Sequence, residues 1–213
     1  MIGSIAHVNV GATGASQDRC AVLSIGSITL VALADGAGNS TAGAEVASAV
    51  IETLLHEAVH GLDLRDERLL VDVLRSLDQR FAKSKTGGES TAVVAALAPG
   101  RVVGASIGDS GACLVPADGH TIDLTKEQLR KPLLGSGRAV PVPFVCGTSP
   151  SMTLVVASDG LFGYVDEARA REIVQSSASV EVAVHNLLAA TRLPTGALRD
   201  DVSIVAVRTN LRR

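Results

Sequence analysis

Four apolar segments of the chain carry an aspartate at one end. These aspartates are Asp35, Asp109, Asp159 and Asp200. Short apolar runs of this kind are typical of strands that are buried on both faces. Carboxylates that several strands bring to one edge of a sheet repel one another unless a cation neutralises them, and hard oxygen ligands favour Mg²⁺ or Mn²⁺ over zinc. The four positions therefore predict a divalent-metal site.

The direction of two strands decides whether these carboxylates meet. Asp159 follows the segment 153–158, whereas Asp200 comes just before the segment 202–207. If the two segments are antiparallel strands, the end of one lies on the same edge of the sheet as the start of the other. The two carboxylates then fall on that edge together.

Asp35 closes the apolar run Leu30–Ala34 and is followed directly by Gly36. Glycine allows a positive φ and a close approach of the backbone, so Gly36 could present its carbonyl oxygen to a metal ion. A single strand that ends in aspartate also occurs in nucleotide-binding folds, in phospho-acceptor domains and in turns with an Asx cap. The repetition at three further strand ends favours the metal site.

Composition limits the classes of fold and partner. The chain has 213 residues, of which 46% are hydrophobic. This length allows a sizeable core but not two full domains, so we expect one domain over residues 1–213. A net charge of −3 and an aromatic content of 2% argue against a nucleic-acid-binding surface.

The cysteines and the N-terminus indicate the compartment. Cys20, Cys113 and Cys146 show no paired spacing, which favours reduced thiols over disulfides or a zinc site. The first residues show no basic segment followed by an apolar core, and no apolar run is long enough to span a bilayer. We expect a cytoplasmic protein that is not bound to a membrane.

Hydrophobic periodicity predicts the order of strands and helices. Strands are expected at residues 4–10, 20–25, 30–34, 91–98, 102–107, 112–115, 153–158 and 202–207, and helices at 41–61, 63–85, 166–174 and 180–191. Asp63 is expected to cap the second helix, with Lys83 and Lys85 in its last turn. Residues 99–100 and 108–111 are expected to form hairpin connections. The proline-containing segment 125–150 is expected to be irregular, with at most a short helix at 126–131.

Strands and helices follow one another in blocks, which favours antiparallel sheets over the strict alternation of a parallel sheet. Strands that are apolar on both faces need a cover on each face, and two stacked sheets with helices outside provide it. We therefore expect an α+β fold, a four-layer α-β-β-α sandwich of two antiparallel sheets flanked by helices.

Six short motifs follow one another along the chain. They are Gln17-Asp18, Ala34-Asp35-Gly36-Ala37-Gly38, Gly88-Glu89-Ser90-Thr91, Gly108-Asp109-Ser110, Ser158-Asp159-Gly160-Leu161-Phe162 and Asp200-Asp201-Val202-Ser203. Their order and spacing resemble the metal-dependent type 2C (PPM) serine/threonine protein phosphatases over nearly the whole chain, and the compact bacterial members in particular. The motifs contain the same aspartates that the strand ends had indicated.

The resemblance implies a role for several of these residues. Asp35 would bridge two Mn²⁺ or Mg²⁺ ions, Gly36 would give a carbonyl oxygen to one of them, and Asp159 and Asp200 would hold the other. Asp18 would orient the attacking water, so Asp18 and Asp35 would be the catalytic pair. A water between two cations is acidic enough to attack phosphorus at neutral pH without a covalent intermediate.

The chain also departs from the family pattern. The family's phosphate-holding arginine, a few residues before the Gln-Asp pair, falls by spacing on Thr13, and His7 is a candidate phosphate contact that could fill its place. Asp109 would belong to an outer, weaker metal site, but Gly163 stands where many members carry an acidic residue, which argues against a third ion. Asn39 replaces the second glycine of the pair that follows Asp35.

We expect metal-dependent hydrolysis of phosphoserine or phosphothreonine in a protein, opposing a serine/threonine kinase. The missing arginine favours an alternative, in which a catalytically weak or inactive relative binds a phosphoprotein as a regulatory module. The three core aspartates argue against this alternative, because an inactive site has no need to keep their mutual repulsion. A hydrolase of small phosphorylated metabolites would fit the same residues, and the sequence does not indicate an oligomeric state.

Overall fold

The computed structural model describes residues 2–38, 41–84 and 87–209. Two five-stranded antiparallel sheets form its centre. The first, here called the β1 sheet, has the strand order β1 (Ile2–Val10), β12 (Val202–Thr209), β11 (Thr153–Ala157), β8 (Gly111–Val115) and β9 (Ile122–Asp123). The second, the β3 sheet, has the order β10 (Val142–Gly147), β7 (Arg101–Ile107), β6 (Ala92–Ala98), β3 (Ile28–Ala34) and β2 (Arg19–Ile25). A further pair is formed by β4 (Gly36–Ala37) and β5 (Glu89–Ser90).

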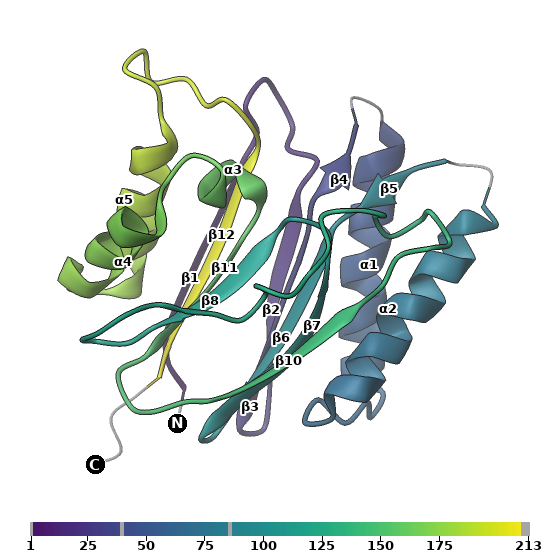
Figure 1. Ribbon diagram of the computed structural model, residues 1–213, viewed down its shortest axis with the longest axis horizontal. Coiled ribbons are helices and arrows are strands. Elements are labelled where there is room, and N and C mark those ends of the chain that lie inside the picture. The colour runs from purple at the N-terminus through teal and green to yellow at the C-terminus, as the bar shows by residue number, and fades with distance from the viewer. Residues whose placement is uncertain (1, 39–40, 85–86, 210–213) are drawn as a thin grey trace.

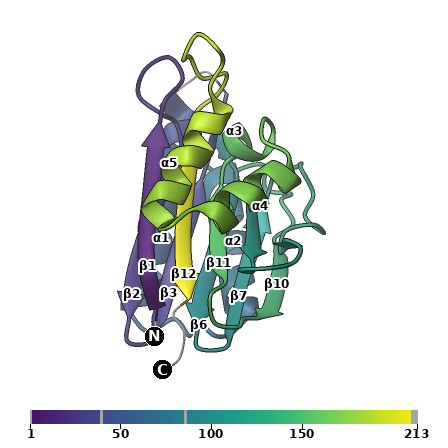
Figure 2. The same cartoon turned by 90° about the vertical axis from the view of Figure 1, so that its left-hand side faces the viewer.

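Helices cover the outer face of each sheet. The β3 sheet is covered by α1 (Thr41–Val59) and α2 (Glu67–Ala82). The β1 sheet is covered by α3 (Asp159–Phe162), α4 (Glu167–Ser176) and α5 (Val180–Thr191). Figure 1 shows the four layers side by side, and Figure 2 shows α4 and α5 lying across the β1 sheet. The predicted four-layer α-β-β-α sandwich is confirmed.

Three buried apolar layers join the four layers of the sandwich. One lies between α1, α2 and the β3 sheet, one between the two sheets, and one between the β1 sheet and its helices. Along β3, Leu30 and Ala32 face the helices, whereas Val31 and Leu33 face the other sheet. Each fully buried leucine or valine side chain stabilises the fold by roughly 1.5–3 kcal/mol. The continuous apolar runs of the sequence follow from this double coverage.

The second helix begins later than predicted. Asp66 rather than Asp63 is the N-cap of α2, and Asp66 Oδ1 accepts a hydrogen bond from the Arg68 backbone N at 3.0 Å. Asp63 accepts from the Arg65 backbone N at 2.9 Å and so closes a turn that precedes the helix. Lys83 is the C-cap, one residue beyond the last turn. The prediction for Lys85 lies outside the described residues.

Two predicted connections were wrong. The strands β6 and β7 form the expected hairpin, but residues 108–111 carry the chain from β7 in one sheet to β8 in the other. The segment 125–150 was predicted to be irregular, yet it includes β10, which pairs with β7 along one side. Pro143 is tolerated in β10 because an edge strand leaves one row of backbone groups without a ladder partner.

Cys20, Cys113 and Cys146 are free thiols, as predicted. In the part of the chain that the structure describes, no helix combines the length and the apolar character needed to cross a bilayer.

Candidate metal and phosphate site

The strand ends converge as predicted. The strands β11 and β12 are antiparallel, with Ala157 opposite Ile204, so Asp159 and Asp200 extend beyond adjacent strand ends. In Figure 1 the β1–β2 loop, the α5–β12 loop, α3 and β4 gather at the upper end of the molecule. This edge of the sandwich is the candidate site.

Hydrogen bonds fix the backbone of Asp35 at the end of β3. Its N–H donates to Thr91 Oγ1 at 3.0 Å, and its carbonyl oxygen accepts from the Thr91 N–H at 2.8 Å and from Ser90 Oγ at 2.9 Å. Thr91 Oγ1 also lies 2.7 Å from Ser110 Oγ. The motifs that contain Ser90 and Ser110 therefore position Asp35.

Gly36 is required by close packing and not by a positive φ. A Cβ atom at Gly36 would lie 2.5 Å from the backbone carbon of Gly43 in α1. The positive φ that was expected at Gly36 occurs instead at Gly38, at 89°. The role of the Gly36 carbonyl as a metal ligand stays a prediction.

Asp18 is fully buried, and neither of its carboxylate oxygens has a hydrogen-bond partner in the described residues. Burial raises the pKa of Asp18, while the nearby hydroxyl groups of Ser158 and Ser203 oppose that rise. A buried carboxylate that lacks a partner is energetically unfavourable and rare in folded proteins. Both oxygens are therefore available to a cation or a water molecule.

The carboxyl group of Asp35 is surrounded by other acids. Burial, together with the negative charges of Asp18, Asp159 and Asp200, raises the pKa of Asp35 to about 9. The pKa of Asp159 is raised by burial and by the charges of Asp109 and Asp200. Acids shift each other in this way when no cation compensates them.

Asp201 positions the loop that carries Asp18. Its two carboxylate oxygens accept hydrogen bonds from the backbone N of Ala12 at 2.8 Å and of Gln17 at 2.6 Å. The β1–β2 loop is thereby held against the start of β12. Thr13 lies in this loop and is exposed.

Asp109 forms an ion pair with Arg130, a residue that the sequence analysis did not select. The guanidinium donates to Asp109 Oδ2 from Nη2 at 2.9 Å and from Nε at 3.2 Å. The positive charge of Arg130 opposes the rise in the pKa of Asp159, which places it beside the cluster of acids. No sequence signal marked Arg130, because it lies in an irregular segment outside every motif.

The segment that carries Arg130 is anchored to α2. Asp78, which is 1% exposed, accepts hydrogen bonds from the backbone N of Gly135 at 2.9 Å, of Gly137 at 2.9 Å and of Ala139 at 3.2 Å. Leu134 pairs with Ser90 through two backbone hydrogen bonds of 3.0 Å. These bonds connect α2, the segment that carries Arg130 and the backbone of Asp35.

His7 lies in the middle of β1, opposite Val205, and is exposed. The strand end that borders the site is at Val10, opposite Val202, so His7 is about 10 Å further along the strand. We therefore do not include His7 among the phosphate contacts proposed below.

The carboxylate oxygens at this edge suit Mg²⁺ or Mn²⁺, because both ions prefer hard oxygen ligands. The negative charges around Asp35 are not compensated, and the two oxygens of Asp18 have no hydrogen-bond partner in the described residues. Within the described residues, no three His, Cys, Asp or Glu side chains are grouped closely enough to hold an ion as they stand. The charges of Asp18 and Asp159 both act on Asp35, so the three carboxyl groups lie near one another. The exact ligand set stays a prediction.

The sequence profile of stage II sporulation protein E (SpoIIE) matches residues 26–210. Among curated proteins no significant match is found.

The fold is shared with solved structures of bacterial phosphatases. A variant of a bacterial serine phosphatase superposes with a TM-score of 0.85 at 18% identity, covering 97% of this chain and 98% of that one. The S. agalactiae serine/threonine phosphatase gives a TM-score of 0.82 at 18% identity, with 97% and 99% covered. The catalytic domain of the serine/threonine phosphatase PstP, in complex with two manganese ions, gives 0.81 at 22% identity, with 99% of each chain covered. Identities this low make the likeness one of fold.

Proposed function

Because the chain belongs to the SpoIIE family, we propose that it is a divalent-metal-dependent phosphatase that acts on phosphoserine or phosphothreonine in a protein. Membership of this family and the shared fold confirm the resemblance to the type 2C phosphatases. The observation that carries the proposed activity is the cluster of uncompensated acids around Asp35 and Asp18. Such a cluster is unfavourable in itself and is accounted for by the cations that it would bind.

In this proposal, Asp35, Asp159, Asp200 and the Gly36 carbonyl hold two ions. Divalent cations at this position would activate a water molecule and offset charge on the phosphoryl oxygens. Asp18 would orient that water through its unpartnered oxygens. The two manganese ions in the PstP structure support the choice of metal and the number of ions. A third ion at Asp109 is not needed, because Arg130 already supplies a positive charge there.

We assign the phosphate anchor to Arg130, which takes the place of the arginine missing at Thr13. Two of its five N–H groups are engaged by Asp109, and the rest can donate to a phosphate oxygen. Its side chain is 80% exposed, so an incoming phosphoprotein can reach it. The segment anchored by Asp78 holds it near the acids.

Substituting Arg130 with alanine is expected to raise KM for a phosphoserine peptide by roughly 5- to 50-fold, with a smaller effect on kcat. A charge-assisted hydrogen bond contributes about 1.5–3 kcal/mol, and exposure to solvent reduces this value. The KM of Arg130→Lys should lie between those of the unsubstituted protein and Arg130→Ala, because lysine lacks the planar fork of the guanidinium. Steady-state kinetics in Mn²⁺ give KM and kcat for the unsubstituted protein and for both Arg130 variants.

Lys131→Ala is the matched control, since it removes one positive charge from the next residue along the chain. It is expected to leave KM within about twofold of the unsubstituted value. An equal rise of KM in Arg130→Ala and Lys131→Ala would mean that general charge, and not an anchor at Arg130, attracts the substrate.

The test of the proposed activity is hydrolysis of a phosphoserine peptide and of an aryl phosphate, each with Mn²⁺ and with EDTA. Both substrates are expected to be hydrolysed in Mn²⁺ and neither in EDTA. Hydrolysis of the aryl phosphate alone would point to small phosphorylated metabolites as substrates. Binding of the phosphopeptide without any hydrolysis in Mn²⁺ would overturn the proposed activity. By the same proposal, the enzyme acts in the cytoplasm against a serine/threonine kinase.

A further inference from the structure

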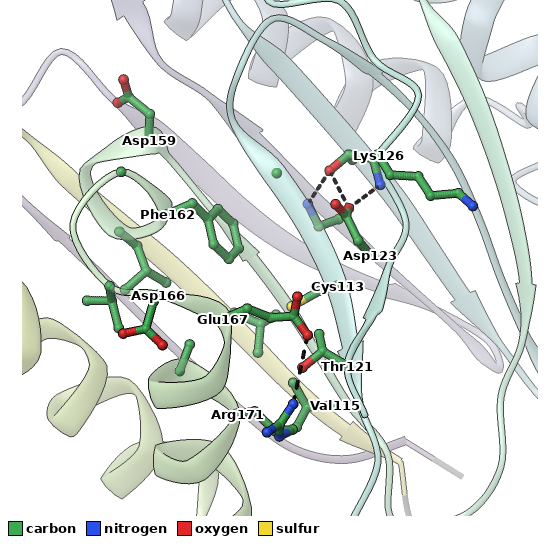
Figure 3. A pocket seen from close by; sticks show the side chains of 18 of the residues that line it. Cys113, Val115, Thr121, Asp123, Lys126, Asp159, Phe162, Asp166, Glu167 and Arg171 are labelled. Atoms are coloured by element: carbon green, nitrogen blue, oxygen red, sulfur yellow. Dashed lines mark hydrogen bonds and ion pairs between the residues drawn. The ribbon is translucent and has the colours of Figure 1, made fainter. Parts of the chain in front are cut away.

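A pocket of about 470 Å³ lies directly beside the candidate site, between β8 and the segment that follows it on one side and α3 and α4 on the other. Its floor is made by side chains of the β1 sheet and its helices, namely Cys113, Val115, Val155, Leu161, Val174 and Leu187. All six are buried. Figure 3 shows Asp159 at one end of this pocket and Arg171 near the other, with the ring of Phe162 projecting between them.

The pocket and the site share residues. Asp109, Arg130 and Asp159 line the pocket as well as the site. Asp159 begins α3 and Phe162 ends it, so a single helical turn joins a proposed metal ligand to the wall of the pocket. A molecule whose phosphate lies at the acids can therefore extend a second group into this space.

The floor of the pocket is uncharged. Cys113 is its one ionisable floor group, and burial, with the charges of Asp123 and Glu167, raises the pKa of its thiol to about 12. The thiol is therefore neutral at physiological pH and packs as a small apolar group. This floor suits an apolar side chain.

Apart from Arg130, which we assign to the phosphate, the basic groups at the rim are paired with acids. Arg171 lies 3.9 Å from Glu167, and Lys126 lies 3.8 Å from Glu127. In Figure 3 the side chain of Lys126 extends away from the centre of the pocket. Both basic groups are thus already matched by an acid.

Two polar atoms of the lining lack a partner. Gln128 Oε1 and Thr121 Oγ1 are buried, and neither has a hydrogen-bond partner in the described residues. The amide of Gln128 is held by its Nε2 group, which donates to the Ser110 carbonyl oxygen at 2.8 Å. An unpaired buried acceptor is unfavourable, so Oε1 gains a partner when the Gln128 side chain turns toward the pocket and meets an N–H group of a ligand.

We propose that this pocket binds an apolar side chain of the phosphoprotein substrate, close in sequence to the phosphorylated residue, and that Gln128 Oε1 accepts a hydrogen bond from the substrate backbone. The inference rests on the proposed function. A phosphopeptide supplies the three groups that this region would bind. Its phosphate lies at the proposed metal site, an apolar side chain lies on the pocket floor, and a backbone N–H group lies between them. The volume is within the range of about 300–1,000 Å³ that is typical of ligand pockets and accommodates a leucine or phenylalanine side chain.

The first test compares phosphoserine peptides on the unsubstituted protein in Mn²⁺. Each peptide carries one leucine among alanines, at one of the four positions before or after the phosphoserine. At one or two neighbouring positions, leucine is expected to raise kcat/KM about tenfold or more over the all-alanine peptide, as burial of such a side chain allows. Equal kcat/KM for all positions would overturn the proposal.

The second test fills the pocket. Ala170 on α4 lines it and is partly buried, whereas Ala168, two residues away on the same helix, is exposed and outside the lining. Ala170→Phe is expected to reduce the preference for the best leucine peptide to about twofold or less, and Ala168→Phe to leave it unchanged. Loss of the preference in both variants, or in neither, would place the apolar contact elsewhere.

An affinity measurement tests the pocket independently of hydrolysis. Affinities of the leucine and all-alanine phosphopeptides, measured by fluorescence polarisation on the same three proteins, report the pocket even if no peptide is hydrolysed. Absence of hydrolysis with a retained affinity difference overturns the proposed activity and supports the pocket. Hydrolysis without any affinity or kcat/KM difference supports the activity and overturns the pocket. If Ala170→Phe does not fold, the peptide series on the unsubstituted protein still decides the proposal.

Discussion

Replacing Asp159 with asparagine is expected to lower Mn²⁺-dependent hydrolysis of a phosphoserine peptide by about a hundredfold or more. The substitution removes one charge and one oxygen ligand from a site that, in our proposal, holds two ions. Asparagine keeps the shape of the side chain, and the hydrogen bond of 2.7 Å from the Gly163 N–H to the carbonyl oxygen of residue 159 is unaffected. The protein should therefore stay folded, which a far-ultraviolet spectrum and a thermal melt will show.

A titration with Mn²⁺ distinguishes the loss of a metal ligand from other causes of lost activity. If Asp159 is a ligand, the variant should need a higher Mn²⁺ concentration for half-maximal rate. Asp118→Asn makes the same chemical change at an exposed aspartate on the loop after β8 and should behave as the unsubstituted protein. Near-normal turnover of Asp159→Asn would remove Asp159 from the ligand set.

The arrangement of the strands could be predicted from the sequence because the signal is local. Leu30–Ala34 and the segment 202–207 are apolar on both faces, and only a strand that is covered on both sides needs such a run. The aspartates at their ends then follow from the antiparallel pairing of β11 and β12. The four layers and the edge that gathers the acids were accessible from these patterns.

Contacts between distant segments were not accessible in this way. The pairing of Asp109 with Arg130 and the anchoring of residues 135–139 by Asp78 join parts of the chain that no periodicity relates. The turn at residues 108–111 resembles a hairpin by composition, yet the chain there passes to the other sheet. Turn residues indicate where a chain reverses and not which strand it joins next. The pocket beside α3 arises from the same long-range packing.

Without divalent cations, the protein is expected to lose stability as the pH rises from about 5 to 9. The pKa of Asp35 is raised from 3.8 to about 9 in the fold, so the folded protein holds a proton that the unfolded chain has released. Between these two values folding takes up a proton, and stability therefore falls with increasing pH. Because the proton is shared with neighbouring acids, we expect a loss of roughly 3 kcal/mol, or a decrease in Tm of about 6–12 °C. Thermal melts in EDTA across this pH range measure it.

Asp35→Asn identifies the group responsible for this loss. The amide removes the charge at the centre of the cluster, so the variant in EDTA should be more stable than the unsubstituted protein at pH 8 and should lose less stability between pH 5 and 9. Asp118→Asn should keep the full pH dependence.

Mn²⁺ provides the complementary measurement, because an ion that binds only the folded state raises Tm by mass action. At pH 8, Mn²⁺ should raise the Tm of the unsubstituted protein and have little effect on Asp35→Asn. These shifts report the site without any substrate. A flat pH profile in EDTA together with no shift by Mn²⁺ would mean that the acids at this edge are compensated within the protein, and the metal site would then have to be abandoned along with the activity that depends on it.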